Sequence, residues 1–181
     1  MLKIFLPFAF AKNVYEIDID FYKKLGVDTI ICDLDNTLEA FYTPNPTQQA
    51  LELIQKLKNS GLRVIIISNN RRKRVETYCK NLDCDFMYST RKPLVYKGKK
   101  FMKKFNIVPE KTIYIGDQVF TDIVFANRLR LKSVLCDNLV KRDQFFTKFN
   151  KFFDKFFRRK MKKKNLVPSW EEILHGINEQ N

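Results

Sequence analysis

The sequence predicts an α/β fold in which a mostly parallel central sheet lies between two layers of helices, a Rossmann-like three-layer sandwich. Two observations support this prediction. Short apolar runs rich in Val and Ile alternate along residues 27–136 with longer segments of helical spacing, an alternation typical of βαβ units. Several of the apolar runs also end abruptly in polar or acidic residues, as strands of an open parallel sheet do where a ligand binds.

The predicted elements follow one another in a regular order. Strands are predicted over residues 27–32, 62–67, 85–88, 111–115 and 131–136. Helices are predicted between them over residues 47–59, 70–81, 93–106 and 119–129. Gly61 follows the first helix, where a helix C-terminus favours a residue that is free to adopt positive φ. We expect one core domain at 27–140, an N-terminal extension at 1–26, a basic helix at 141–164 and a C-terminal tail at 165–181.

Composition narrows the class of protein. A chain of 181 residues with 45% hydrophobic and 30% charged residues is long enough for one globular domain with a substantial core. No apolar run approaches the ~20 residues that a membrane-spanning helix needs. The four cysteines show no CxxC spacing and His175 is the single histidine, which argues against a zinc site, a disulfide framework and histidine-based catalysis. We expect reduced thiols and a cytoplasmic location.

The end of the first predicted strand is the most informative stretch. Residues 27–38 read VDTIICDLDNTL, so an apolar run passes directly into Asp33 and Asp35. Two neighbouring carboxylates at the carboxyl end of a strand repel each other unless a cation or a phosphoryl group lies between them. The pair therefore predicts a cation or phosphate site at this edge of the sheet.

The later strands also end in polar residues. Ser68 and Asn69 follow the second strand, Lys92 comes shortly after the third, and Asp117 and Asp122 follow the fourth. Each signal alone is weak, because Ser-Asn after a strand is an ordinary helix N-cap. Since a parallel sheet brings these ends to one edge, we expect the side chains to converge in one site.

This set of side chains suits phosphoryl transfer through a covalent intermediate. Asp33 is the candidate nucleophile, which would form an aspartyl phosphate, and Asp35 is the candidate general acid and base. Strict strand alternation would place both on one face, although a turn after the strand can re-aim Asp35. Mg²⁺ prefers octahedral oxygen ligation, and its candidate ligands are Asp33, Asp35 through the backbone carbonyl, Asp117 and Asp122.

Three further residues are candidates for binding the substrate phosphate. Ser68 and the backbone N–H of Asn69 would hold phosphoryl oxygens at a helix N-terminus, and Lys92 would offset their negative charge. The run Arg71-Arg72-Lys73-Arg74 fits either a solvated helix face or a contact with the substrate.

These residues resemble the four motifs of the haloacid dehalogenase-like (HAD) superfamily, namely DLDNT at 33–37, Ser68, Lys92 and GDQVFTD at 116–122. The motifs together with the flanking MLKIFLP and NRLRLKSVL segments are similar to the YqeG-like, subfamily IIIA phosphatases. The resemblance covers nearly the whole chain and implies a HAD-type fold, a Mg²⁺ cofactor and a phosphomonoester substrate. Relatives of this subfamily include mitochondrial phosphatidylglycerophosphate phosphatases, which implies a lipid substrate.

The spacing between motifs predicts that the fold has no cap domain. Thirty residues separate Thr37 from Ser68, and twenty-three separate Ser68 from Lys92. Each gap holds little more than one helix and one strand. Such an open site favours a large or surface-bound substrate.

The basic segment 141–164 carries most of the net charge of +14, with eleven Lys or Arg against two Asp. Its phenylalanines recur at the spacing of one helix face, at Phe145, Phe146, Phe149, Phe152, Phe153, Phe156 and Phe157. Such a helix could pack its rings on the core, lie on an anionic membrane surface at the cytoplasmic face, or bind nucleic acid, the least favoured of the three. The alternative function is accordingly a nucleic-acid-binding or assembly factor on a HAD fold with incidental phosphatase activity.

Overall fold

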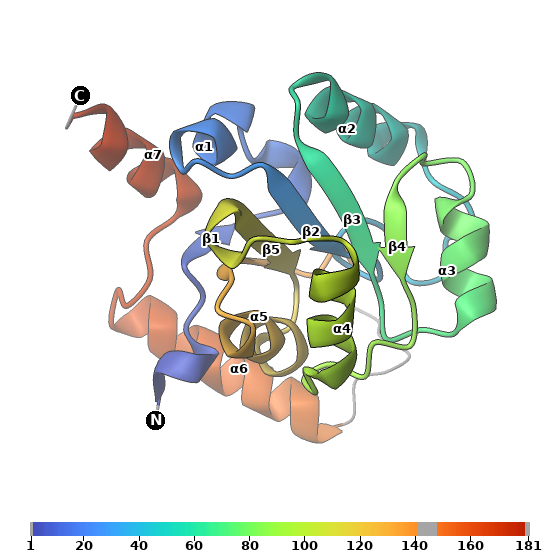
Figure 1. Cartoon of the computed structure of the whole chain (residues 1–181). Coiled ribbons are helices and arrows are strands. Elements are labelled where there is room, and N and C mark those ends of the chain that lie inside the picture. The colour runs from blue at the N-terminus through green and yellow to red at the C-terminus, as the bar shows by residue number, and fades with distance from the viewer. Residues whose placement is uncertain (1, 141–147, 180–181) are drawn as a thin grey trace.

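The computed structural model describes residues 2–140 and 148–179, which form a parallel six-stranded sheet with helices on both faces (Figure 1). The strands are β1 (Ala9–Ala11), β2 (Thr29–Asp33), β3 (Arg63–Ile67), β4 (Asp85–Met87), β5 (Thr112–Gly116) and β6 (Lys132–Cys136). They lie in the order β1-β6-β5-β2-β3-β4, and every neighbouring pair is parallel. The predicted fold class is confirmed, and all five predicted strands are present close to their predicted bounds.

The helices connect the strands and pack on both faces of the sheet. They are α1 (Ile19–Lys24), α2 (Gln48–Asn59), α3 (Arg72–Cys79), α4 (Tyr96–Lys104), α5 (Val124–Arg128), α6 (Lys148–Lys163) and α7 (Trp170–Asn178). Short 3₁₀ turns lie at Leu2–Phe5 (η1), Val14–Glu16 (η2) and Pro109–Lys111 (η3), and a π-helical turn lies at Val119–Ile123 (η4). Thr47 caps α2 by accepting a hydrogen bond from the Ala50 N–H, as a helix N-cap threonine is expected to do.

Alternation along the strands separates two layers of core. Ile30 and Cys32 of β2 join a cluster that includes side chains from α1, α2, α3 and α7. Ile31 joins the opposite cluster, with Phe101 of α4 and Phe125 of α5. Because helices cover both faces, strand residues of either parity are buried, which explains the nearly continuous apolar runs in the sequence.

The structure adds elements that the sequence pattern did not predict. β1 is only three residues long, too short for a readable alternation, yet it pairs with β6 from Ala9 to Ala11. The segment before residue 27 thus contributes an edge strand to the sheet and also contains α1. The predicted helix at 119–129 is divided into η4 and α5, because its first turn is wider than an α-helix.

The described residues contain no cap domain, as predicted. The interval from Thr37 to Ser68 holds only α2 and β3, and the interval from Ser68 to Lys92 holds only α3 and β4. The carboxyl edge of the sheet around β2 is therefore not covered by an inserted domain.

Helix α6 packs across the same side of the molecule as α5 (Figure 1). Phe157 and Met161 are buried against η4, β6 and the N-terminal segment, whereas Phe152 and Phe156 are 73% and 51% exposed. The predicted aromatic stripe is thus divided between the core and the surface. Its first residues, Phe145, Phe146 and the Phe149 side chain, lie outside what the structure describes. Among the described residues, none of the helices combines the length and the apolar character needed to cross a membrane.

Candidate active site

The carboxyl ends of β2, β3 and β5 bring the predicted motif residues to one edge of the sheet. Asp33 is the last residue of β2 and lies in register with Ile67, one residue before Ser68. Asp117 follows directly after β5, the neighbour of β2 on its other side. Sheet order therefore explains how residues 84 positions apart become neighbours.

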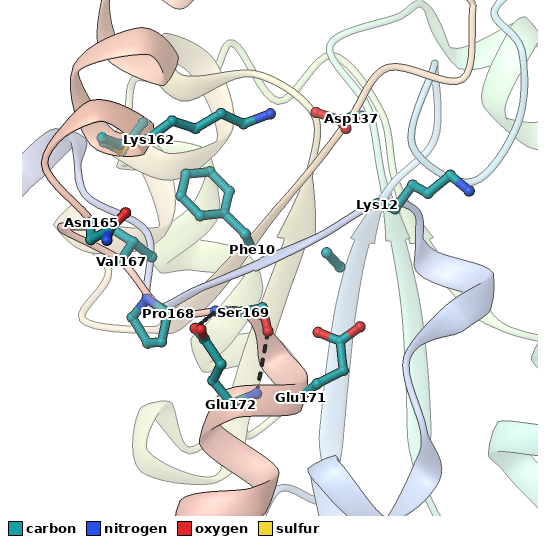
Figure 2. Close-up of a pocket in the computed structure, with 12 residues that line it drawn as sticks. Phe10, Lys12, Asp137, Lys162, Asn165, Val167, Pro168, Ser169, Glu171 and Glu172 are labelled. Carbon is teal, nitrogen blue, oxygen red and sulfur yellow. Dashed lines mark hydrogen bonds between the residues drawn. The ribbon is translucent and has the colours of Figure 1, made fainter.

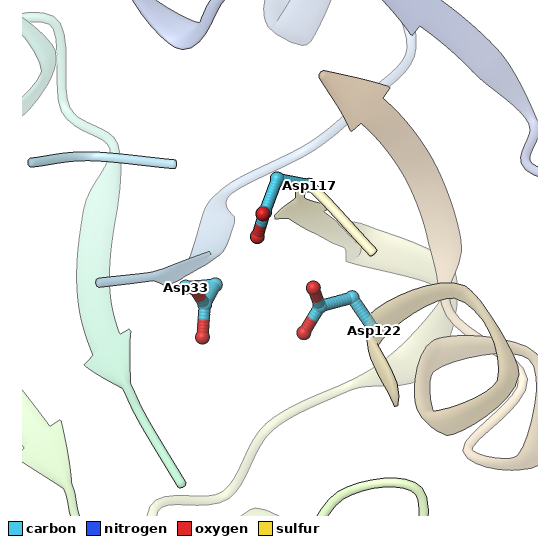
Figure 3. A group of neighbouring side chains, drawn as sticks. All are labelled: Asp33, Asp117 and Asp122. Carbon is cyan, nitrogen blue, oxygen red and sulfur yellow. The ribbon is translucent and has the colours of Figure 1, made fainter. Parts of the chain in front are cut away.

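Three of the predicted metal ligands form one buried group of carboxylates (Figure 3). Asp33, Asp117 and Asp122 each offer a carboxylate oxygen, and these oxygens lie within 4.8 Å of one another. Asp122 comes from η4, where its Oδ2 accepts a hydrogen bond from the Gln118 N–H at 3.0 Å. Hard oxygen ligands at this spacing suit a small divalent cation.

Lys92 lies within this acidic group. Its ammonium Nζ donates to Asp33 and, at 2.6 Å, to Asp122, and its side chain is only 2% exposed. Tyr114 of β5 completes the arrangement, since its hydroxyl lies 2.9 Å from both Lys92 Nζ and Asp122 Oδ1. Tyr114 was not among the predicted site residues, because a tyrosine within an apolar strand looks like an ordinary core residue.

Burial sets the electrostatics of the site. It raises the pKa of the Asp33 carboxyl to about 8, with Lys92 opposing the rise and the carboxylates of Asp122 and Asp35 adding to it. Burial also acts to lower the pKa of Lys92, but the attraction of Asp122 and Asp33 outweighs it and the net shift is upward. The Lys92 ammonium pairs with both Asp33 and Asp122, and three carboxyl groups this close together favour the uptake of a cation.

Asp35 is not one of the three clustered carboxylates, although it lies near enough to raise the pKa of Asp33. Asn36, in the turn after β2, has φ 69°, and the Ser68 hydroxyl donates to Asp35 Oδ2 at 2.9 Å. Asp35 and Ser68 line the same pocket as Asp33. The nucleophile candidate and the proton-transfer candidate thus line one cavity.

The Asn69 side chain organises the loop that carries Lys92. Its Oδ1 accepts hydrogen bonds from the Lys92 N–H and the Thr90 hydroxyl, both at 2.7 Å, and its Nδ2 donates to the Lys92 carbonyl at 3.1 Å. The predicted role of Asn69 was to donate its backbone N–H to a phosphoryl oxygen, and these side-chain hydrogen bonds do not involve that N–H.

Helix α6 is bonded directly to the loop that carries Asp117. Asp154 of α6 accepts a hydrogen bond from the Val119 N–H at 2.9 Å, and Arg158 donates to the carbonyls of Asp117 and Cys136. Arg158 also pairs with Asp154 at 2.7 Å. Neither residue was among the predicted site residues, because the phenylalanines of this segment indicated packing, membrane or nucleic-acid contacts; one acid within a basic helix was the available signal.

Two cavities differ in their chemistry. The cavity at the site has a volume of about 320 Å³ and is lined by all the predicted site residues except Asp117, together with Asn70, Pro93, Gln118, Phe120 and Thr121. A second cavity, of about 820 Å³, lies between β1 and the ends of α6 and α7 (Figure 2). Lys12 and Lys162 there face Asp137, Glu171 and Glu172, so that cavity has charges of both signs and no concentrated acidic or basic group.

Comparisons with known proteins agree with this geometry. Residues 20–136 match the family described as haloacid dehalogenase-like hydrolases. The chain is 34% identical over 170 residues to the protein named "Probable phosphatase YqeG" of Bacillus subtilis. The aligned region covers 94% of this chain and 98% of that protein. It is 26% identical over 150 residues to phosphatidylglycerophosphate phosphatase 1, chloroplastic/mitochondrial, of Arabidopsis thaliana. That alignment covers 78% of this chain and 43% of that protein.

Solved structures share the fold at low sequence identity. A Vibrio cholerae protein described as a candidate 3-deoxy-D-manno-octulosonate 8-phosphate phosphatase aligns with a TM-score of 0.53 at 20% identity, covering 71% of this chain and 78% of that one. An uncharacterised Listeria monocytogenes protein aligns with a TM-score of 0.50 at 16% identity, covering 65% and 85%. These structures show the fold, whereas the family match and the 34% identical relative show the class of enzyme: the protein is a phosphatase, the chain belongs to the haloacid dehalogenase-like hydrolases and, within them, to the YqeG-like phosphatases.

Proposed function

We propose that this phosphatase is a Mg²⁺-dependent phosphomonoester hydrolase that works through an aspartyl-phosphate intermediate on Asp33. The observation that supports the proposal most directly is the buried group of Asp33, Asp117 and Asp122 around Lys92. These carboxylates, with the Asp35 backbone carbonyl, would hold Mg²⁺. The bound ion would supply positive charge that favours the Asp33 carboxylate over the carboxylic acid and offsets the charge of the phosphoryl oxygens.

In the first half-reaction, a carboxylate oxygen of Asp33 attacks phosphorus, and the bond from phosphorus to the leaving oxygen breaks. Asp35 donates a proton to that oxygen, which departs as an alcohol. In the second half-reaction, Asp35 takes a proton from water as the water attacks phosphorus, and Asp33 and inorganic phosphate are released.

Lys92, Ser68 and the Asn69 backbone N–H serve the phosphoryl group throughout the proposed reaction. Lys92 keeps Asp33 and Asp122 in place and lowers the net negative charge that an incoming phosphate meets. The Ser68 hydroxyl and the Asn69 N–H would donate to phosphoryl oxygens at the start of the α3 segment.

The proposed substrate is phosphatidylglycerophosphate or another large or surface-bound phosphomonoester. The absence of a cap among the described residues leaves room for a bulky leaving group, and one relative is named as a phosphatidylglycerophosphate phosphatase. Leu94 and Tyr96, 59% and 68% exposed, follow Pro93 at the rim of the cavity. Exposed apolar side chains beside an open site suit a substrate that lies in an interface.

The proposed surface is an anionic membrane face in the cytoplasm, bound peripherally through α6. Phe152 and Phe156 form an exposed pair one turn apart, and Lys155 and Arg159 are exposed on the same helix. Phe153 of α6 contacts Phe120, which lines the cavity, so the exposed pair lies on a helix that borders the site. Rings at the acyl boundary with cations at the headgroups would bind such a surface reversibly.

The catalytic part of the proposal is tested with an aryl phosphate, in the presence of Mg²⁺ or of excess chelator. We expect Mg²⁺-dependent hydrolysis by the wild-type protein, none by Asp33→Asn, and wild-type rates for Asp83→Asn, whose side chain is 96% exposed. Equal rates for the wild-type protein and Asp33→Asn would remove Asp33 as the nucleophile.

The substrate and the surface are tested separately. We expect phosphatidylglycerophosphate in vesicles to be hydrolysed faster than soluble glycerol phosphate, and the protein to sediment with anionic but not neutral vesicles, less so as salt rises. If sedimentation does not depend on the charge of the lipid, and the protein shifts RNA in a gel at the same salt concentration, the nucleic-acid alternative is favoured instead.

A further inference from the structure

The Asp35 carboxylate is held by three donors that come from the segment after β3. Ser68 Oγ lies 2.9 Å from Asp35 Oδ2, and Asn70 Nδ2 lies 3.4 Å from the same oxygen. Arg74 Nη2 lies 3.2 Å from the other oxygen, Oδ1. Arg74 is therefore the donor to Asp35 that carries a positive charge.

One of these three bonds cannot persist when phosphate is bound as proposed. A serine hydroxyl has a single proton, so Ser68 cannot donate at the same time to a phosphoryl oxygen and to Asp35. The Asn70 contact at 3.4 Å is near the outer limit of a hydrogen bond. During phosphoryl transfer, Arg74 is then the principal group that fixes the position of Asp35.

Arg74 is itself held in place. Its side chain is 17% exposed, its Nη1 lies 3.4 Å from the Pro44 carbonyl oxygen, and its Cζ lies 5.1 Å from the ring centroid of buried Tyr78. Arg72, two positions earlier in the same basic run, is 68% exposed and pairs with Glu76. The run is thus a solvated helix face at Arg72 but not at Arg74.

We propose that Arg74 is a positioning residue that holds Asp35 where its proton reaches the leaving-group oxygen. The inference rests on the proposed function. As the bond from Asp33 to phosphorus forms and the bond to the leaving oxygen breaks, the Asp35 proton passes to that oxygen. Once Asp35 has donated its proton, its side chain is a carboxylate, and the adjacent guanidinium of Arg74 stabilises this negative charge.

The experiment compares two esters that differ in their need for a proton. An alkyl phosphate requires protonation of its leaving oxygen, whereas 2,4-dinitrophenyl phosphate departs as a stable anion without it. We would measure kcat/KM, which covers the steps up to transfer to Asp33, for the wild-type protein, Arg74→Met, Arg74→Lys and the matched control Arg72→Met. Methionine keeps an unbranched side chain beside Tyr78, and the rate for the dinitrophenyl ester reports whether each variant is folded.

We expect Arg74→Met to lower kcat/KM for the alkyl ester about 10- to 100-fold more than for the dinitrophenyl ester, because general acid catalysis contributes roughly 10²- to 10⁴-fold. Arg74→Lys should recover part of this difference, and Arg72→Met should change neither value. An equal loss for both esters would overturn the inference, because it would make Arg74 a phosphate-binding or purely structural residue.

The same assay separates this inference from the function on which it rests. Hydrolysis that depends on Asp33, with an unchanged ratio between the two esters in Arg74→Met, would refute only the role of Arg74. Hydrolysis that persists in Asp33→Asn would refute the proposed mechanism, and the role of Arg74 with it.

Discussion

Helix α6 allows one substitution to be compared at two positions that differ mainly in burial. Phe157 is 7% exposed, and its ring centroid lies 4.6 Å from those of Phe5 and Phe153. Phe152 is 73% exposed. Truncating a buried phenylalanine to alanine costs ~3–5 kcal/mol, and we take the lower end for Phe157 because its cluster is small. An exposed substitution usually changes stability by less than about 0.5 kcal/mol.

These energies translate into a clear difference in thermal unfolding. For a chain of this size, 1 kcal/mol shifts Tm by roughly 2–4 °C. We therefore expect Phe157→Ala to lower Tm by about 6–12 °C, and Phe152→Ala to lower it by less than about 2 °C. Circular dichroism at 222 nm during heating measures both. Helix propensity changes equally in the two variants, so it cancels in the comparison.

The same pair of variants separates packing from surface binding. We expect Phe152→Ala to weaken sedimentation with anionic vesicles while leaving Tm nearly unchanged. Equal Tm values for Phe157→Ala and the wild-type protein would refute the packing of α6 on the core. Equal losses of stability in both variants would show that burial does not distinguish the two positions.

Three further predictions concern the site loop and the thiols. Asp154→Ala should destabilise the protein by about 2 kcal/mol, because the Val119 N–H loses its acceptor; urea unfolding measures this, and a midpoint equal to that of the wild-type protein would contradict it. Gly116→Ala should reduce turnover about 100-fold, since the added Cβ would lie 2.5 Å from Asp122 Cβ and displace that carboxylate; full activity in a steady-state assay would refute the close approach. Iodoacetamide at pH 8 should modify half-buried Cys84 first, because the other three thiols are buried and have raised pKa values that keep them protonated; mass spectrometry after brief labelling identifies the modified residue.

Between residues 27 and 136 the sequence is enough to predict the order of the strands and the polar residues at their ends. Apolar runs with β-branched residues are local signals, and the polarity change at Asp33 marks the end of β2 without reference to the rest of the chain. The convergence of Ser68, Lys92 and Asp122 on Asp33 was also predictable, because the carboxyl ends of parallel strands share one edge. The family motifs at these positions led to the same conclusion.

The residues that support the site become visible only in the folded chain. Tyr114 and Arg74 carry no sequence signal of their role, and Asp154 carries only the weak signal of one acid within a basic helix, because each acts on a residue of a different element, at positions 122, 35 and 119. The contacts of the Asp35 carboxylate likewise come from residues that follow β3. Phe157 is buried and Phe152 is exposed because only one side of α6 packs against η4 and the N-terminal segment. Helical spacing fixes which residues lie on one face of a helix. How many of those residues become buried depends on the shape of the protein surface against which the helix packs.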